Sequence, residues 1–276
     1  MDILVSARQL HDMTGAACIL DASAHLPSAG RDAGAEFAAA HVPGARFLDL
    51  ASWYDAASPV PKAIPRADQI AARLGALGVD PAQPVVLYDD SHLRSACRAF
   101  LILNGAGYEN IAVLDGGFAA WRAEGLPVES GSVEPEPSAL APPRSAAAIR
   151  SKANMLANIG TAAEQVVDAR DATRFGGEPD AIHGLPGGHI PGARNLFFRD
   201  LLADDGRFLP PGELVAAFRR AGIDPVRPLV ATCGSGMTAS VVLFAHRLLG
   251  HDHGALYDGS WAEWGADPDT PKGTAA

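Results

Sequence analysis

Cysteine is scarce in this sequence, with only Cys18, Cys97 and Cys233 among 276 residues. These three form no Cys-x-x-Cys pair and have no metal-like spacing to histidine. Small secreted domains are held by several paired cysteines, so an odd number of isolated ones argues against a disulfide framework. A single reactive thiol fits this pattern better.

Long apolar runs and surplus positive charge are also missing. No run approaches the roughly 18 residues of a membrane span, and residues 1–5 lack the basic and apolar regions of a signal peptide. The net charge of −10 argues against nucleic-acid binding, which depends on basic side chains that neutralise phosphates. We therefore expect a cytoplasmic protein that binds neither membranes nor nucleic acid.

What the sequence does contain is an internal repeat. Four short motifs occur twice in the same order, at offsets of 147, 148, 144 and 143 residues. Such regular spacing predicts two homologous domains. The paired positions are Asp21 and Asp168, His41 and His189, Gly78 and Gly222, and Asp115 and Asp258.

The repeat sets the expected domain boundaries. We predict one domain over residues 1–128, a linker over 129–145, and a second domain over 146–276. The linker contains Glu-Pro-Glu-Pro and Pro-Pro, a composition that cannot bury a core. Within each half, short β-branched runs alternate with helical patterns such as residues 67–74 and 211–218. This alternation predicts an α/β fold, with a mostly parallel sheet covered by helices on both faces in each domain.

Cys233 occupies the most informative position in the chain. It follows a buried strand predicted over residues 229–232 and opens a tight loop that leads into a helix from about Thr238. Gly234 and Gly236 allow close approach of the backbone. Loop amides and a helix N-terminus attract anions and stabilise a thiolate, so the pattern favours a nucleophilic cysteine over a small packed one.

Comparison of the two halves assigns the chemistry to the second. When Thr232 is aligned with Tyr88, Asp89 falls opposite Cys233, so the first half lacks the nucleophile. Cys97 lies on a predicted helix and Cys18 at a strand start, where both are expected to pack. His41 and His189 occupy the same repeat position in both halves, which favours a turn-stabilising role over a catalytic one.

The loop Cys-Gly-Ser-Gly-Met-Thr-Ala that begins at Cys233 resembles the active-site loop of the rhodanese superfamily. It is most similar to the Cys-Gly-Ser-Gly-Val-Thr-Ala form of 3-mercaptopyruvate sulfurtransferases. Thiosulfate-preferring members carry basic residues where this sequence has Gly234 and Ser235. The resemblance extends over about residues 2 to 270 and implies two tandem rhodanese-like domains.

The resemblance also implies an activity. A persulfide would form on Cys233 from 3-mercaptopyruvate or thiosulfate, and its sulfur would pass to cyanide, a small thiol or a thioredoxin-like protein. No metal or organic cofactor is implied. Ser235 would handle a proton, Asp55 would be an acidic partner from the first half, and Arg174 would hold the substrate carboxylate. The remaining substrate-binding positions would be Gly234, Gly236, Met237 and Thr238.

Two departures from the family pattern fall in the expected substrate region. A Glu-Pro segment is followed by Asp180, where the family usually has an arginine. A His-Met-Leu-Pro segment of the first half is replaced by one that begins at Lys62, and Lys62 or Arg66 could supply the missing charge. Turn propensity remains an alternative explanation for Ser235, and a solvated loop position for Asp55.

A cysteine on this kind of loop is also compatible with phosphate-ester hydrolysis or with a binding role without turnover. A phosphatase of the His-Cys-x5-Arg type is disfavoured, because Thr232 precedes the cysteine and Ala239 stands where the phosphate-clamping arginine would be. A thiosulfate-preferring rhodanese and a non-catalytic sulfur carrier or partner-binding module remain alternatives.

Overall fold

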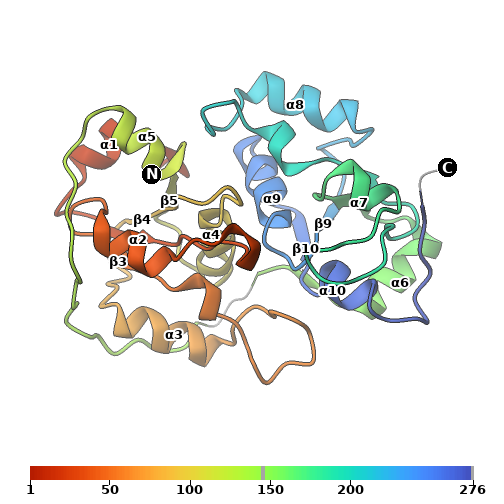
Figure 1. Ribbon diagram of the computed structural model, residues 1–276, viewed down its shortest axis with the longest axis horizontal. Coiled ribbons are helices and arrows are strands. Elements are labelled where there is room, and N and C mark those ends of the chain that lie inside the picture. The colour runs from red at the N-terminus through yellow and green to blue at the C-terminus, as the bar shows by residue number, and fades with distance from the viewer. Residues whose placement is uncertain (144–146, 275–276) are drawn as a thin grey trace. The chain divides into compact units, whose positions relative to one another are not determined.

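The computed structural model describes residues 1–143 and 147–274, which form two compact units (Figure 1). The first unit comprises Met1–Asp55, Ile64–Ala147 and Asp204–Arg207. The second comprises Ala56–Ala63, Ala148–Ala203 and Phe208–Ala276. Positions 144–146, where the predicted linker meets the second predicted domain, and positions 275–276 at its end lie outside the described residues.

Each unit is built on one five-stranded sheet in which every pairing between the named strands is parallel. The strand orders are β1-β5-β4-β2-β3 and β6-β10-β9-β7-β8. The second order is the first with each strand replaced by its repeat partner, so the internal repeat is structural. In the first unit the strands are β1 (Leu4–Val5), β2 (Cys18–Asp21), β3 (Arg46–Phe47), β4 (Val85–Tyr88) and β5 (Ile111–Leu114); in the second they are β6 (Ile149–Arg150), β7 (Gln165–Asp168), β8 (Arg194–Asn195), β9 (Leu229–Thr232) and β10 (Gly254–Tyr257).

Helices cover the sheets. The first unit contains α1 (Ala7–Asp12), α2 (Ala33–Ala39), α3 (Ala67–Ala76), α4 (Ala96–Gly105) and α5 (Gly117–Ala123), with short 3-10 helices at Pro27–Ala29 and Leu50–Ser52. The second contains α6 (Lys152–Thr161), α7 (Ala172–Gly176), α8 (Pro211–Arg220), α9 (Ala239–Leu248) and α10 (Ser260–Trp264), with a 3-10 helix at Phe198–Leu201.

Burial of the central strands confirms the predicted layering. All four residues of β4 and all four of β9 are buried. Successive side chains of a strand point to opposite faces, so a strand that is buried throughout is covered on both sides. In the first unit, Val86 and Tyr88 pack with Leu10 of α1 and Trp121 of α5, while α4 contacts β4 and β5.

The repeated histidines have the structural role that the sequence predicts. His41 Nδ1 lies 2.8 Å from the carbonyl oxygen of Phe37, and its ring stacks on the Phe37 ring with centroids 4.1 Å apart. His189 Nδ1 lies 2.9 Å from the carbonyl oxygen of Phe175, and its ring stacks on that phenylalanine at 3.9 Å. The same pair of contacts in both units fixes the turn that follows each histidine.

The predicted linker lies along the first unit over its described residues. Gly131 donates a backbone hydrogen bond to Ala38 at 2.7 Å, and Ser138 donates one to Gly75 at 2.8 Å. These backbone hydrogen bonds hold the linker against the first unit, so the linker needs no apolar side chains that bury a core of their own. This explains how a proline-rich segment can follow a folded surface. The domain boundaries drawn from the sequence stay a prediction.

Candidate active site

Cys233 sits directly after β9, and α9 begins six residues later at Ala239, as predicted. The thiol residue is 2% exposed. Its backbone amide donates to Ser260 Oγ at 3.2 Å, and the Ser260 hydroxyl donates to the Tyr257 carbonyl at 2.9 Å. The Trp261 amide donates to the Cys233 carbonyl at 3.0 Å. The start of α10 therefore holds both sides of the Cys233 backbone, and Ser260 does so with a left-handed φ of 50°.

The loop after Cys233 is fixed by its carbonyl groups. The Ala262 amide donates to the Gly234 carbonyl at 2.8 Å, and the Ser240 hydroxyl donates to the Gly236 carbonyl at 2.9 Å. Gly236 has a φ of 80°, a conformation that favours glycine. Within the described part of the chain, the backbone amides of Ser235, Met237 and Thr238 donate no hydrogen bond. They are therefore available to an anion at the α9 N-terminus.

His183 packs against this loop and explains why position 234 is glycine. A Cβ atom at Gly234 would lie 2.2 Å from His183 Cε1 and 2.9 Å from Nε2. The other ring nitrogen, Nδ1, lies 3.1 Å from Asp180 Oδ2. A carboxylate accepts, so Nδ1 carries the proton in this pair and Nε2 faces the loop. The imidazole thus fills the space that a side chain at position 234 would need.

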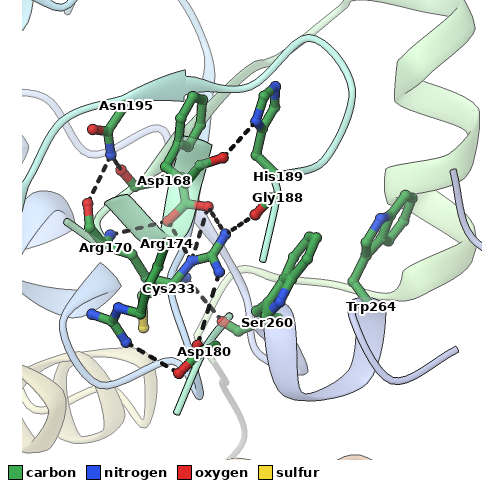
Figure 2. A network of polar contacts seen from close by, with 12 residues as sticks. Asp168, Arg170, Arg174, Asp180, Gly188, His189, Asn195, Cys233, Ser260 and Trp264 are labelled. Carbon is green, nitrogen blue, oxygen red and sulfur yellow. Dashed lines mark hydrogen bonds and ion pairs between the residues drawn. The ribbon is translucent and has the colours of Figure 1, made fainter. Parts of the chain in front are cut away.

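A buried ion pair lies beneath the loop. Arg170 and Asp168 are each 1% exposed, and Arg170 Nη2 lies 2.6 Å from Asp168 Oδ2. The same nitrogen donates to the Gly188 carbonyl at 2.6 Å, and the guanidinium stacks over the Trp261 ring at 4.4 Å. Figure 2 shows this pair in one network with Cys233 and Ser260. Arg170 therefore connects the end of β7 to the helix that holds Cys233.

Asp180 is the second buried acid of the network. It is fully buried, with Oδ2 3.9 Å from Arg170 Nη1 and Oδ1 3.6 Å from Arg174 Nη1. Its Oδ1 also accepts the Ile182 amide at 3.1 Å. At the place where the family usually has an arginine, this chain therefore has an acid whose carboxylate is engaged by its own cations.

Arg174 is held mainly by Asp171. Its Nε donates to Asp171 Oδ2 at 2.6 Å, and its backbone amide donates to Oδ1 at 3.0 Å. Burial acts to raise the pKa of Asp171, but hydrogen bonds from the Arg174 amide, the Thr173 hydroxyl and the Arg174 guanidinium outweigh it and hold that pKa at about 2. The Arg174 side chain is 18% exposed, so solvent reaches a guanidinium that already has an acidic partner.

The remaining candidate positions divide between the two units. Ser235, Gly234, Gly236, Met237 and Thr238 lie together on the Cys233 loop. Their roles in substrate binding and proton transfer stay predictions.

Asp55, the predicted acidic partner, belongs to the first unit. Its Oδ1 accepts from Arg66 Nη1 at 2.6 Å and from Gln69 Nε2 at 3.2 Å. Asp55 is therefore more than a solvated loop residue. Its proposed partnership with Cys233 stays a prediction, as does the charge that Lys62 or Arg66 could supply.

Sequence reasoning missed His183 and Arg170. The repeat offered a signal for one of them, because Asp168-Ala169-Arg170 replaces the Asp21-Ala22-Ser23 of the first half. A charge that is present only in the half with the nucleophile indicates a site residue. His183 gave no such signal, since its approach to Gly234 depends on the path of the loop between α7 and β8.

Comparison with known proteins agrees with this geometry. The Rhodanese-like domain family matches residues 6–124 and 151–267. The chain is 41% identical to 3-mercaptopyruvate sulfurtransferase of Mus musculus over 249 residues, 89% of this chain and 84% of the relative. It is 38% identical to thiosulfate sulfurtransferase of Bos taurus over 251 residues, 89% of this chain and 84% of that one.

Among solved structures, that of SseA from Escherichia coli, described as a 3-mercaptopyruvate sulfotransferase, superposes with a TM-score of 0.83 at 33% identity. The match covers 95% of this chain and 99% of SseA. The chain belongs to the rhodanese family, as a protein with two rhodanese-like domains. The resemblance read from the Cys233 loop and from the internal repeat is confirmed.

Cys233 is expected to react with iodoacetamide faster than the other two cysteines at neutral pH. All three are buried, so exposure alone does not separate them. Burial, reinforced by Asp89, raises the pKa of the Cys97 thiol well above its ordinary value. Burial also raises the pKa of Cys18, although Arg46 opposes it. Peptide mapping after brief labelling measures the order, and labelling of Cys97 first would contradict the alignment of the two halves.

Gly234→Ala should destabilise the second unit by about 1–3 kcal/mol, because the new methyl group overlaps the His183 ring. On a His183→Ala background the same change should cost much less. Chemical denaturation of the two single variants and the double variant measures this coupling. Gly212→Ala is the matched control, since a Cβ there meets nothing within 4 Å. An equal cost for Gly234→Ala in both backgrounds would show that His183 is not the obstacle.

Proposed function

We propose that this protein is a sulfurtransferase that carries a sulfane sulfur as a persulfide on Cys233. The observation that carries the proposal is the placement of Cys233 before the α9 N-terminus, on a loop where the amides of Ser235, Met237 and Thr238 donate to no described residue and can bind negative charge. The relatives named above are sulfurtransferases, which supports the same class of enzyme.

The proposed reaction has two steps. The Cys233 thiolate attacks the sulfur of 3-mercaptopyruvate, an S–S bond forms, the C–S bond breaks, and its electron pair stays on carbon as the enolate of pyruvate. The proton on the transferred sulfur moves to that carbon, which leaves pyruvate and a persulfide anion. In the second step an acceptor thiolate or cyanide attacks the outer sulfur, and the Cys233 thiolate is released.

Charge around Arg174 favours 3-mercaptopyruvate as the donor. Two guanidinium groups, those of Arg170 and Arg174, face the three carboxylates of Asp168, Asp171 and Asp180, so the cluster has no surplus positive charge. Thiosulfate is a dianion with both charges close to the reacting sulfur. The single carboxylate of 3-mercaptopyruvate is farther from that sulfur and requires one cation, which Arg174 can supply by exchanging an aspartate for the substrate.

The Cys233 loop also favours 3-mercaptopyruvate over thiosulfate as the donor. Thiosulfate-preferring members carry basic residues where this chain has Gly234 and Ser235, and here the space beside Gly234 is filled by His183. The His183 ring is already paired with Asp180. Identities of 41% to a 3-mercaptopyruvate enzyme and 38% to a thiosulfate enzyme are too similar to decide the donor. A thiosulfate preference therefore remains the second candidate for the donor.

The acceptor and the compartment belong to the same proposal. Its acceptors are cyanide, a small thiol or a thioredoxin-like protein, each of which can attack a persulfide sulfur. All three cysteines are free in the structure, which supports a reducing compartment such as the cytoplasm. No helix within the described ranges is long and apolar enough to cross a membrane.

The persulfide can be tested by intact-mass measurement after exposure to excess 3-mercaptopyruvate. The protein should gain the mass of one sulfur atom and lose it on treatment with cyanide. Cys233→Ser should gain nothing. Cys97→Ser is the matched control and should behave like the wild type, because Cys97 is a packed residue of α4. Absence of the adduct in the wild type would favour the alternative of a non-catalytic carrier or partner-binding module.

Donor preference and the role of Arg174 can be tested together by kinetics. We expect kcat/KM to be higher for 3-mercaptopyruvate than for thiosulfate. Arg174→Ala should lower kcat/KM for 3-mercaptopyruvate roughly thirtyfold, about 2 kcal/mol, as for loss of a charged hydrogen bond. Arg220→Ala, an exposed change on α8, is the control. Faster turnover of thiosulfate, or an unchanged kcat/KM in Arg174→Ala, would show that the donor finds its charge elsewhere.

A further inference from the structure

Three histidines gather at the end of α9 that lies away from Cys233. His246 is in the last turn of α9, and His251 and His253 follow in the segment that leads into β10. One ring nitrogen from each lies within 4.8 Å of the others. Their ring centroids are 4.9 to 5.3 Å apart. The sulfur chemistry described above makes no use of this cluster.

His246 is oriented as metal-binding histidines usually are. Its side chain is buried, and Nε2 lies 2.8 Å from the carbonyl oxygen of Pro225. A carbonyl only accepts, so Nε2 carries the proton and Nδ1 keeps its lone pair. Histidine ligands generally donate their second ring N–H to a carbonyl or carboxylate, which fixes the tautomer and the ring.

A glycine lies next to this lone pair. A Cβ atom at Gly254 would lie 2.8 Å from Leu243 Cδ2 and 3.2 Å from His246 Nδ1. A side chain at position 254 would therefore crowd both α9 and the donor atom.

We propose that His246, His251 and His253 form a binding site for a late first-row divalent cation, Zn²⁺ in particular, with water completing a tetrahedral shell. Imidazole nitrogen suits Zn²⁺, Cu²⁺ and Ni²⁺, and three histidines with one water form a known kind of zinc shell. Zn–N bonds of about 2.0–2.1 Å require the nitrogens to approach more closely than 4.8 Å. His251 is half-buried and His253 is exposed, so these two side chains can turn inward onto the fixed ring of His246.

The position of the site indicates a structural effect. His246 is seven residues after Ala239, so about 10 Å of helix separates the cluster from the start of α9 at the catalytic loop. An ion there would join the C-terminal end of α9 to the segment before β10. It would stabilise the second unit without taking part in sulfur transfer.

The test uses Cys233→Ser protein without a polyhistidine tag, because a reactive thiol and a tag would both bind Zn²⁺. Isothermal titration with Zn²⁺ should show one equivalent. Replacement of both mobile ligands, as His251→Ala with His253→Ala, should weaken binding about a hundredfold or more. His92→Ala, which removes an exposed histidine outside the cluster, should leave binding unchanged.

Two further measurements keep the result independent of how well the variants fold. A Zn²⁺ concentration about a hundredfold above the Kd should raise the melting midpoint of the second unit by roughly 5 °C, and the double variant should lose this shift. Co²⁺ in the same site should show the strong visible absorption of a tetrahedral nitrogen shell. Absence of binding to the Cys233→Ser protein, or one equivalent bound equally well by the folded double variant, would overturn the proposal.

Discussion

The geometry around Cys233 depends on the buried guanidinium of Arg170. It neutralises Asp168 at the end of β7, binds the Gly188 carbonyl and stacks on Trp261, whose own amide holds the Cys233 carbonyl. Removal of one partner of a buried ion pair typically costs about 3–5 kcal/mol, because the other charge stays buried without compensation. Three segments, around Asp168, Gly188 and Trp261, thus share one cation, and the Cys233 loop is attached to it through α10.

The buried positive charge of Arg170 also explains the unusual acid at position 180. Nη1 of Arg170 makes no hydrogen bond to any described residue and lies 3.9 Å from Asp180 Oδ2. The fully buried Asp180 carboxylate also draws in Arg174 and His183. An arginine here would add a third positive charge, whereas the aspartate places a third carboxylate beside the two guanidinium groups of Arg170 and Arg174. Position 180 therefore carries an acid that is engaged by Arg170, Arg174 and His183.

Much of this architecture could be read from the sequence, because it repeats local patterns. Strand β9, the start of α9 and the shared role of His41 and His189 follow from periodicity, glycine placement and repetition. His183 could not be predicted in the same way. Its approach to Gly234 arises from a loop anchored by buried Asp180, and no periodic signal encodes such a contact. Long-range ionic contacts of this kind depend on the complete fold.

The first unit has Asp89 in place of the nucleophile, and its loop amides are used differently. Asp89, at the position of Cys233, keeps the backbone contact of that position, because its carbonyl accepts the Phe118 amide of α5 at 2.9 Å. Its carboxylate accepts the amides of Ser91 and of Ala96 at the start of α4, at 3.0 and 2.8 Å. The Asp89 carboxylate thus accepts hydrogen bonds from loop amides that could otherwise bind an anion. In the second unit a cysteine stands at this position, and the amides of Ser235, Met237 and Thr238 donate to no described residue.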